Sequence, residues 1–260
     1  MRRPGTHDPG HVAQGAGGGA APERFAAWLS GHAHADPSVG AVYRYHSRSD
    51  AHSKELARLI WLDLLEHCGA MRLDHDAGSL IMKVNYRHVW SRTGKAKTID
   101  LALGCPDGSG GLDEVRLSCE LKAVMTEHGK SQPRVFDELS SSHQIVHQGN
   151  PRALAAGVTL VNIASEFVSP LRQRPGAPLA VSRHRQPAAA ASMVGHLRGL
   201  AVRAGDSQDG FDAYCTIVID CDNQGPAVFW TAHPAPQPGD GDHYATFLER
   251  LCQAYAERHP

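Results

Sequence analysis

The chain has 260 residues, of which 42% are apolar and 20% are charged, and its formal net charge is −1. This length can bury one substantial core, and no run approaches the roughly 18 apolar residues that cross a bilayer. Arg2 and Arg3 are not followed by an apolar stretch, and the six cysteines are scattered without a C-x-x-C pair. The composition therefore argues against a membrane anchor, a secretion signal and a disulfide-rich domain, and it predicts a cytoplasmic protein with reduced thiols.

The first predicted features are a tail and a helix. Residues 1–22 are rich in Gly, Ala, His and Pro and lack periodic apolar positions, so we expect a disordered tail there. Residues 23–260 are then expected to form a single domain whose core lies at about 50–164. Residues 52–68 are apolar around most of the helical circumference, which predicts a packed helix that ends at Gly69.

Strand patterns dominate the next part of the chain. A turn rich in Gly and Pro at 104–111 predicts an antiparallel hairpin. Strands are expected at 79–85, 97–103 and 114–124, followed by a helix at 131–147 and a strand at 157–164. The order α-β-β-β-α-β predicts an α/β fold with a mixed central sheet flanked by helices.

The C-terminal part adds to this core. Residues 169–187 form a basic loop rich in Pro and Arg, and residues 188–203 have the pattern of a small-residue helix. Two further strands are expected at 214–219 and 227–231, and a final amphipathic helix spans about 242–256.

Positive charge is segregated along the sequence despite the nearly neutral total. Residues 77–99 contain five basic residues and no acid, and residues 167–205 contain six arginines and no acid. Such stretches indicate a locally positive surface, for which a phosphate backbone is the usual partner. Two solvated loops are the alternative interpretation.

Three side chains form the pattern that carries chemistry. In the strand at 114–124, period-two alternation places Glu120 and Lys122 side by side, opposite an apolar stripe. Asp100 lies among apolar residues of the preceding strand, where an acid is costly unless it is paired or binds a cation. If the strands pair, Asp100 and Glu120 converge beside Lys122, and two carboxylates with waters and a substrate phosphate suit Mg²⁺. A surface Glu–Lys pair with an Asp at a strand end is the alternative.

Other catalytic patterns are weaker or missing from the sequence. His143 and His147 are four residues apart in the second helix, which could suit a metal, but a polar helix face explains both because no third ligand is evident. The sequence contains no H-E-x-x-H, no P-loop and no G-x-S-x-G motif.

The segment from about residue 50 to 164 resembles the PD-(D/E)XK nuclease superfamily, which has the restriction-endonuclease-like fold. The resemblance consists of Asp100, then 19 intervening residues, then Glu120, Leu121 and Lys122, set in the superfamily's order of helices and strands. The proline that usually precedes the first acid is Ile99 here.

The resemblance implies metal-dependent hydrolysis of a phosphodiester, usually in DNA. Asp100 and Glu120 would hold Mg²⁺ with the main-chain carbonyl of Leu121, and Lys122 would position or activate the attacking water. Many members add an acid from the first helix, for which Glu55 is the natural candidate and Glu66 a weaker one.

Basic residues outside this motif are candidates for DNA contacts. Basic residues before and after the motif strand, and those of the loop at 169–187, could bind phosphates. The loop could also read bases. Solvated loop charge explains these residues equally well. The candidates are Lys95, Lys97, His128, Lys130, Arg134, Arg172, Arg174, Arg183 and Arg185.

The predicted function is a type II restriction endonuclease that uses Mg²⁺ to cut duplex DNA at a specific site. A palindromic target favours a homodimer in which each subunit cuts one strand, and a cognate DNA methyltransferase encoded nearby would accompany it. Such an enzyme is cytoplasmic and joins the nucleoid when it binds DNA. A repair or junction-resolving nuclease, a non-catalytic nucleic-acid-binding or assembly protein on the same fold, and a small-molecule enzyme are the alternatives.

Overall fold

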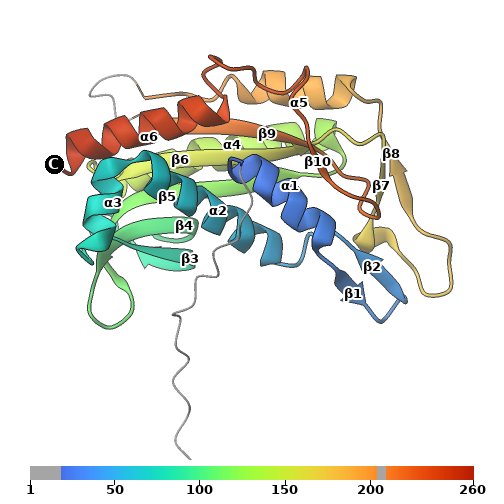
Figure 1. Cartoon of the computed structure of the whole chain (residues 1–260), viewed down its shortest axis with the longest axis horizontal. Coiled ribbons are helices and arrows are strands. Elements are labelled where there is room, and N and C mark those ends of the chain that lie inside the picture. The colour runs from blue at the N-terminus through green and yellow to red at the C-terminus, as the bar shows by residue number, and fades with distance from the viewer. Residues whose placement is uncertain (1–18, 204–208) are drawn as a thin grey trace, which may run out of the picture.

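A computed structural model of the chain describes residues 19–203 and 209–260. Its centre is a six-stranded sheet in the order β10-β9-β6-β5-β4-β3 (Figure 1). Strands β5, β6 and β9 are parallel, and the other neighbours are antiparallel. The bounds are β3 (Ile81–Val89), β4 (Ala96–Pro106), β5 (Leu112–Val124), β6 (Leu154–Asn162), β9 (Ala213–Asp220) and β10 (Val228–Phe229). The predicted α/β fold with a mixed sheet is confirmed.

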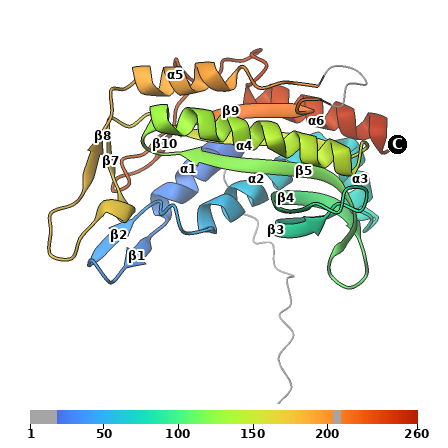
Figure 2. The same cartoon turned by 180° about the vertical axis from the view of Figure 1, so that it is seen from behind.

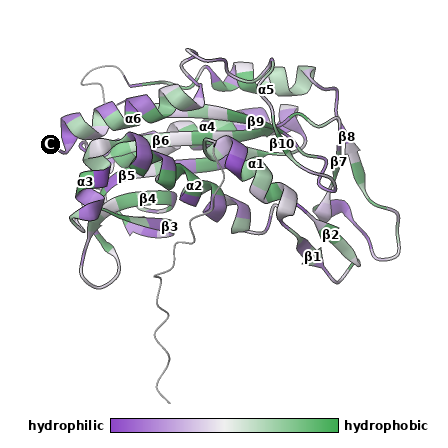
Figure 3. Ribbon diagram, viewed as in Figure 1, coloured by the Kyte–Doolittle hydropathy of each residue, from purple (hydrophilic) through white to green (hydrophobic). Residues whose placement is uncertain are grey.

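Each face of the sheet carries its own hydrophobic core. One face is covered by α1 (Ala21–Gly31), α2 (Ala51–His67), α3 (Gly69–Asp76) and α6 (Tyr244–Arg258), as Figure 1 shows. The other is covered by α4 (His128–Gly149) and α5 (Ala188–Leu197), as Figure 2 shows. All nine residues of β6 are buried, and Figure 3 shows the central strands as largely hydrophobic. A strand between two cores needs apolar side chains on both faces.

Helix α1 begins at Ala21, within the segment that the sequence assigns to a tail, and residues 1–18 lie outside the described residues. Phe25 and Leu29, one turn apart, are fully buried. The buried carboxylate of Asp63 in α2 accepts a hydrogen bond from the Ala21 N–H over 2.6 Å and pairs with Arg24. This partner lies 42 residues from Ala21, so the local sequence pattern does not reveal the start of the helix.

Two short hairpins protrude at one end of the molecule (Figures 1 and 2). The first joins β1 (His34–Asp36) to β2 (Ala41–Tyr43), and the second joins β7 (Glu166–Val168) to β8 (Val181–Arg183). The second, with the short 3₁₀ helix η1 (Pro170–Arg172), occupies most of the predicted loop. Asn223, in the turn after β9, anchors both hairpins because its buried Nδ2 donates to the carbonyl oxygens of Tyr45 (2.9 Å) and Val168 (2.8 Å).

The helix predicted at 52–68 is α2, which ends at His67, but the predicted role of Gly69 and two other helix boundaries are wrong. Gly69 begins α3, because Cys68 is extended and the chain starts a new helix after it. Helix α4 begins at His128 instead of 131, because Glu127 reverses the chain with a φ of 52°. Helix α5 ends at Leu197 instead of 203.

A glycine in β4 controls how that strand meets β5. The predicted turn begins at Gly104, but β4 continues to Pro106, and the pairing shifts between Leu103 and Gly104. A Cβ atom at Gly104 would overlap the main-chain oxygen of Glu114. Only glycine therefore permits this approach of the two strands.

We expect Gly104→Ala to lower the free energy of unfolding by about 2–3 kcal/mol, because the added methyl group forces the two backbones apart. Gly195→Ala is the control, since a Cβ there meets nothing within 4 Å and the residue lies inside α5. The control should be neutral or more stable by about 0.5–1 kcal/mol. Urea denaturation measures both, and equal stability of Gly104→Ala and the wild type would contradict the expectation.

Candidate active site

Strands β4 and β5 separate at the position of the predicted acids. Their last paired residues in this direction are Leu101 and Cys119, so Asp100 lies just beyond the ladder. On the other side of β4 lies β3, and its residue Asn85 has a left-handed conformation with a φ of 50°. Asn85 has no partner in the pairing of β3 with β4. The N–H of Leu121 donates to Asp100 Oδ2 over 2.8 Å. The Asp100 side chain thus replaces a backbone partner at the point where the sheet opens.

The Glu120 carboxylate is buried and held by two ammonium groups. Its Oε1 lies 2.7 Å from Lys122 Nζ, and its Oε2 lies 2.8 Å from Lys97 Nζ. The hydroxyl of Ser142 in α4 donates to Oε2 over 3.4 Å. These contacts compensate the cost of placing a charged acid inside the sheet.

Lys122 lies between two carboxylates. Besides Glu120, its Nζ contacts Glu138 Oε2 of α4 at 3.2 Å. Glu138 also lies 3.6 Å from the exposed guanidinium of Arg134. Lys122 is therefore tied to β5 on one side and to α4 on the other.

Burial and the charge of Glu120 raise the pKa of Asp100 to about 6. Burial also opposes ionisation of Glu120, but the charges of Lys122 and Lys97 outweigh it and lower the pKa of that carboxyl. Burial opposes the charged form of Lys122, yet Glu120 and Glu138 hold the pKa of Lys122 above its ordinary value. Near neutral pH Glu120 is therefore ionised and Lys122 is protonated, and Asp100 is the less compensated of the two acids.

The site presents several oxygen donors. The two oxygens of Glu120, one oxygen of Asp100 and the main-chain carbonyl of Leu121 are hard ligands of the type that Mg²⁺ takes. Because the N–H and C=O of a strand residue point to the same side, the Leu121 carbonyl faces β4 as its N–H does. Among residues 19–203 and 209–260, no group of three or more His, Cys, Asp or Glu side chains could hold a metal, so waters and substrate would have to complete the coordination of any cation here. A cation at Glu120 Oε2 requires that Lys97 leave that oxygen, and a cation at Oε1 requires that Lys122 leave it.

A cavity of about 330 Å³ opens beside Lys122. Tyr45, from the segment after β2, and His52 of α2 line one part of it, and Arg134 and Glu138 of α4 line another. The cavity therefore spans the opening between the two helical layers. It gives a small polar group access to the Lys122 ammonium.

Glu55 is not brought to the acids. Its two oxygens bind the Arg58 guanidinium in the same helix, at 2.9 and 2.6 Å, and its charge is not among those that shift the pKa of Asp100 or Glu120. Glu66 is exposed near the far end of α2. The structure thus does not support the first-helix acid that the resemblance implies.

The candidate DNA-binding residues fall into separate groups. His128 is buried with its Nε2 2.7 Å from the Asn162 carbonyl oxygen, which removes it from the set. Lys97 belongs to the acidic cluster, and Lys95 contacts Gln148 near the C-terminal end of α4, away from the hairpins. The remaining six are exposed near the N-terminal end of α4 or on the β7–β8 hairpin: Lys130, Arg134, Arg172, Arg174, Arg183 and Arg185.

Sequence reasoning missed the contributions of α4 to the site. Glu138 and Ser142 lie one turn apart and adjoin the apolar face of α4, and this helical spacing is the signal that could have indicated them. His143 and His147 are buried and meet the main chain of Gly210, through the N–H and the carbonyl oxygen respectively, which accounts for both without a metal.

Comparison of the chain with protein-family models, curated proteins and solved structures finds no match. Among the described residues, none of the helices has the length and apolar character needed to cross a membrane.

We expect Asp100→Asn to raise the free energy of unfolding at pH 8 by up to about 3 kcal/mol. The folded-state pKa of about 6 lies above the ordinary value of 3.8, so the stability gained from the protonated form is complete below pH 4 and lost as the pH rises through about 6. Asparagine keeps an oxygen that can accept from Leu121 and does not titrate. Urea denaturation at pH 4 and pH 8 tests this.

Glu120→Gln is the matched comparison. It leaves Lys97 and Lys122 without their shared carboxylate, so a loss of about 3 kcal/mol is expected at pH 8. Destabilisation of both variants at pH 8 would contradict the account of Asp100.

Proposed function

We propose that this chain is a metal-dependent nuclease that hydrolyses phosphodiester bonds in DNA with Mg²⁺. One observation carries the proposal: Asp100 of β4 and the Glu120–Lys122 ion pair of β5 meet where the two strands separate. The element order α2, α3, β3, β4, β5, α4, β6, in which α3 is an additional short helix, and the mixed sheet support a restriction-endonuclease-like core.

Asp100, Glu120 and the Leu121 carbonyl would hold Mg²⁺, which supplies Lewis acidity toward a phosphoryl oxygen and toward water. Lys122 keeps its proton because two carboxylates raise its pKa, so its role is to donate a hydrogen bond and stabilise developing negative charge. Glu138 positions that ammonium from α4. Lys97 neutralises Glu120 in the absence of the cation and becomes available to a phosphate when it is displaced.

Duplex DNA is the substrate that the exposed arginines favour. Arg174 and Arg185 lie on or beside the β7–β8 hairpin, and their guanidinium groups form no ion pair within the described residues. Arg172 donates to Ser182, and Arg183 pairs with Glu166. We favour a type II restriction endonuclease that acts in the cytoplasm as a homodimer beside a cognate methyltransferase, with a repair or junction-resolving nuclease as the variant of the same chemistry.

A non-catalytic nucleic-acid-binding protein is the second candidate. It is favoured by the complete pairing of Glu120, whose two oxygens are both occupied by lysines. A carboxylate that two lysines already neutralise has less need of a cation.

Plasmid nicking in Mg²⁺ separates the two candidates. We expect the wild type to cut, and Asp100→Ala and Lys122→Ala to lose at least about 100-fold in rate, because each removes charge stabilisation at the phosphoryl group. Glu55→Ala should stay close to the wild type, because its carboxylate serves Arg58. If the wild type cuts no plasmid of varied sequence and modification yet binds duplex with a steep salt dependence, the second candidate is correct.

The hairpin contributes to DNA affinity if the proposal holds. Arg174→Ala with Arg185→Ala should lower the slope of log K against log[salt] by about 2, one for each lost phosphate contact. Arg72→Ala is the control, since it removes an exposed charge from α3, outside both basic stretches and at the other end of the molecule from the hairpin (Figure 1). An unchanged slope in the double variant, measured by fluorescence anisotropy, would exclude these contacts.

A further inference from the structure

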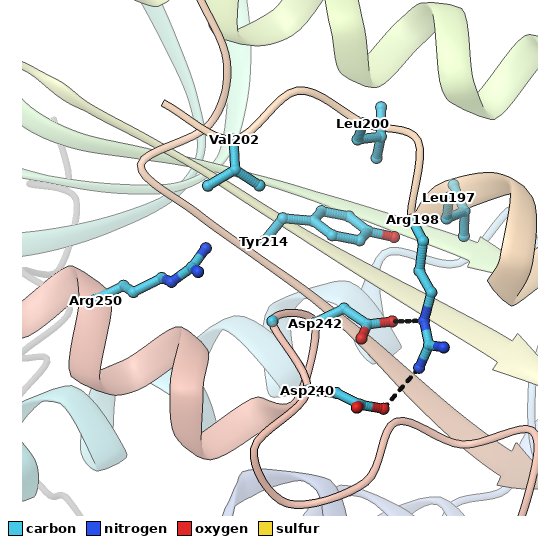
Figure 4. A pocket seen from close by; sticks show the side chains of 9 residues that line it. Leu197, Arg198, Leu200, Val202, Tyr214, Asp240, Asp242 and Arg250 are labelled. Atoms are coloured by element: carbon cyan, nitrogen blue, oxygen red, sulfur yellow. Dashed lines mark hydrogen bonds and ion pairs between the residues drawn. The ribbon is translucent and has the colours of Figure 1, made fainter. Parts of the chain in front are cut away.

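A second pocket lies at the opposite edge of the sheet from β3, where β9 is incompletely covered. The segment after α5 covers the beginning of β9, with the Arg203 N–H donating to the Phe211 carbonyl oxygen over 2.7 Å. The loop after β10 covers Thr216, whose N–H donates to the Asp242 carbonyl oxygen over 3.1 Å. Between these contacts, at Tyr214, lies a pocket of about 350 Å³ (Figure 4).

The walls of this pocket differ from one side to the other. Leu197, Leu200 and Val202 provide an apolar wall, and the ring of Tyr214 lies between them and α6 (Figure 4). Residues two apart in a strand point their main-chain groups to the same side, so the N–H and C=O of Tyr214 face the same open edge as those of Thr216. An apolar wall with polar groups at its margin is typical of a small-molecule site.

The charged residues of the pocket lie at two opposite ends. At one end, Arg198 donates to Asp240 at 2.7 Å and to Asp242 at 3.1 Å, so one guanidinium serves two carboxylates and one negative charge is left over. At the other, Arg250 reaches in from α6 (Figure 4), and its guanidinium has no ion pair or hydrogen bond within the described residues. The pocket as a whole is thus dipolar, with acceptors at one end and a cation at the other.

A ligand for this pocket needs three features in one molecule. An anionic group satisfies Arg250, a flat ring packs against Tyr214 and the leucines, and N–H donors on the ring satisfy the carboxylates. Guanine presents two neighbouring N–H donors for the Oδ1 atoms of Asp240 and Asp242, because Arg198 occupies only the Oδ2 atom of each, whereas adenine lacks this pair. A nucleoside monophosphate is a ligand of suitable size for a pocket at the lower end of the usual volume range.

We propose that this pocket binds a free guanine nucleotide, with its phosphate on Arg250 and its base edge on the Asp240–Asp242 pair. The site is independent of the proposed nuclease centre, since β6 separates β9 from β5 in the sheet. Its occupant would hold the C-terminal half of the chain together, because α5, β9, the loop after β10 and α6 all contribute side chains.

Isothermal titration of the full chain in Mg²⁺-free buffer tests the proposal, with guanosine 5′-monophosphate as the probe. We expect saturable one-to-one binding that is at least about 10-fold tighter than for adenosine 5′-monophosphate, guanosine or inorganic phosphate. Arg250→Ala should weaken it at least about 10-fold, and Val202→Trp should abolish it by filling the pocket. Arg92→Ala, which removes an exposed arginine elsewhere, should bind as the wild type does.

Circular dichroism checks that each variant is folded, and plasmid nicking is measured separately, so a failure here leaves the nuclease proposal intact. Absence of saturable binding to the wild type at millimolar probe overturns the site. Equal affinity for the adenine and guanine nucleotides overturns the role of the carboxylates. Tighter binding of phenylalanine, an aromatic zwitterion, overturns the nucleotide in favour of an amino acid. Tighter binding of a guanine dinucleotide overturns a free mononucleotide in favour of a strand end.

Discussion

Two carboxylates lie side by side where β4 leaves β5, Glu120 buried and Asp100 half-buried, and this is the constraint on which the site depends. Glu120 is ionised because Lys97 and Lys122 both reach it, and those lysines come from the two separating strands. Asp100 receives only a main-chain N–H and the more distant charges, and its pKa rises to about 6. The sheet opens where a side-chain contact replaces the hydrogen bonds of the β4–β5 ladder. The carboxylate that makes this contact, Asp100, has no lysine directly paired with it among the described residues.

A site of this kind opposes stability and favours ligand binding. An acid that is held ionised without enough positive charge around it lowers the free energy of unfolding, and a bound cation would offset part of this loss. Helix α4 also stabilises the site, because Glu138 contacts Lys122 and Ser142 donates to Glu120. The chemistry therefore depends on the packing of α4 against the sheet as much as on the strands that carry the motif.

The sequence predicts correctly those parts of the fold and the site that depend on local residue patterns. Alternation along β5 predicts that Glu120 and Lys122 are neighbours, and the glycine-rich turn predicts the antiparallel pairing of β4 with β5. It was insufficient where a partner lies far along the chain: Asp63 holds the start of α1, and Lys97 turns inward to Glu120 instead of toward solvent. His128 and Glu55 were predicted by their proximity to the motif and by analogy, and both are occupied by other contacts.

The single amide of Asn223 links parts of the molecule that no continuous element joins. It holds the carbonyl of Tyr45, which lines the cavity beside Lys122, and that of Val168, at the base of the arginine-bearing hairpin. A tilt of either hairpin about its base would strain the hydrogen bonds of Asn223. A macromolecule that displaced the arginine-bearing hairpin would therefore also act on Tyr45 in the wall of the cavity beside Lys122, so one side-chain amide would couple binding at the hairpin to access at the cavity.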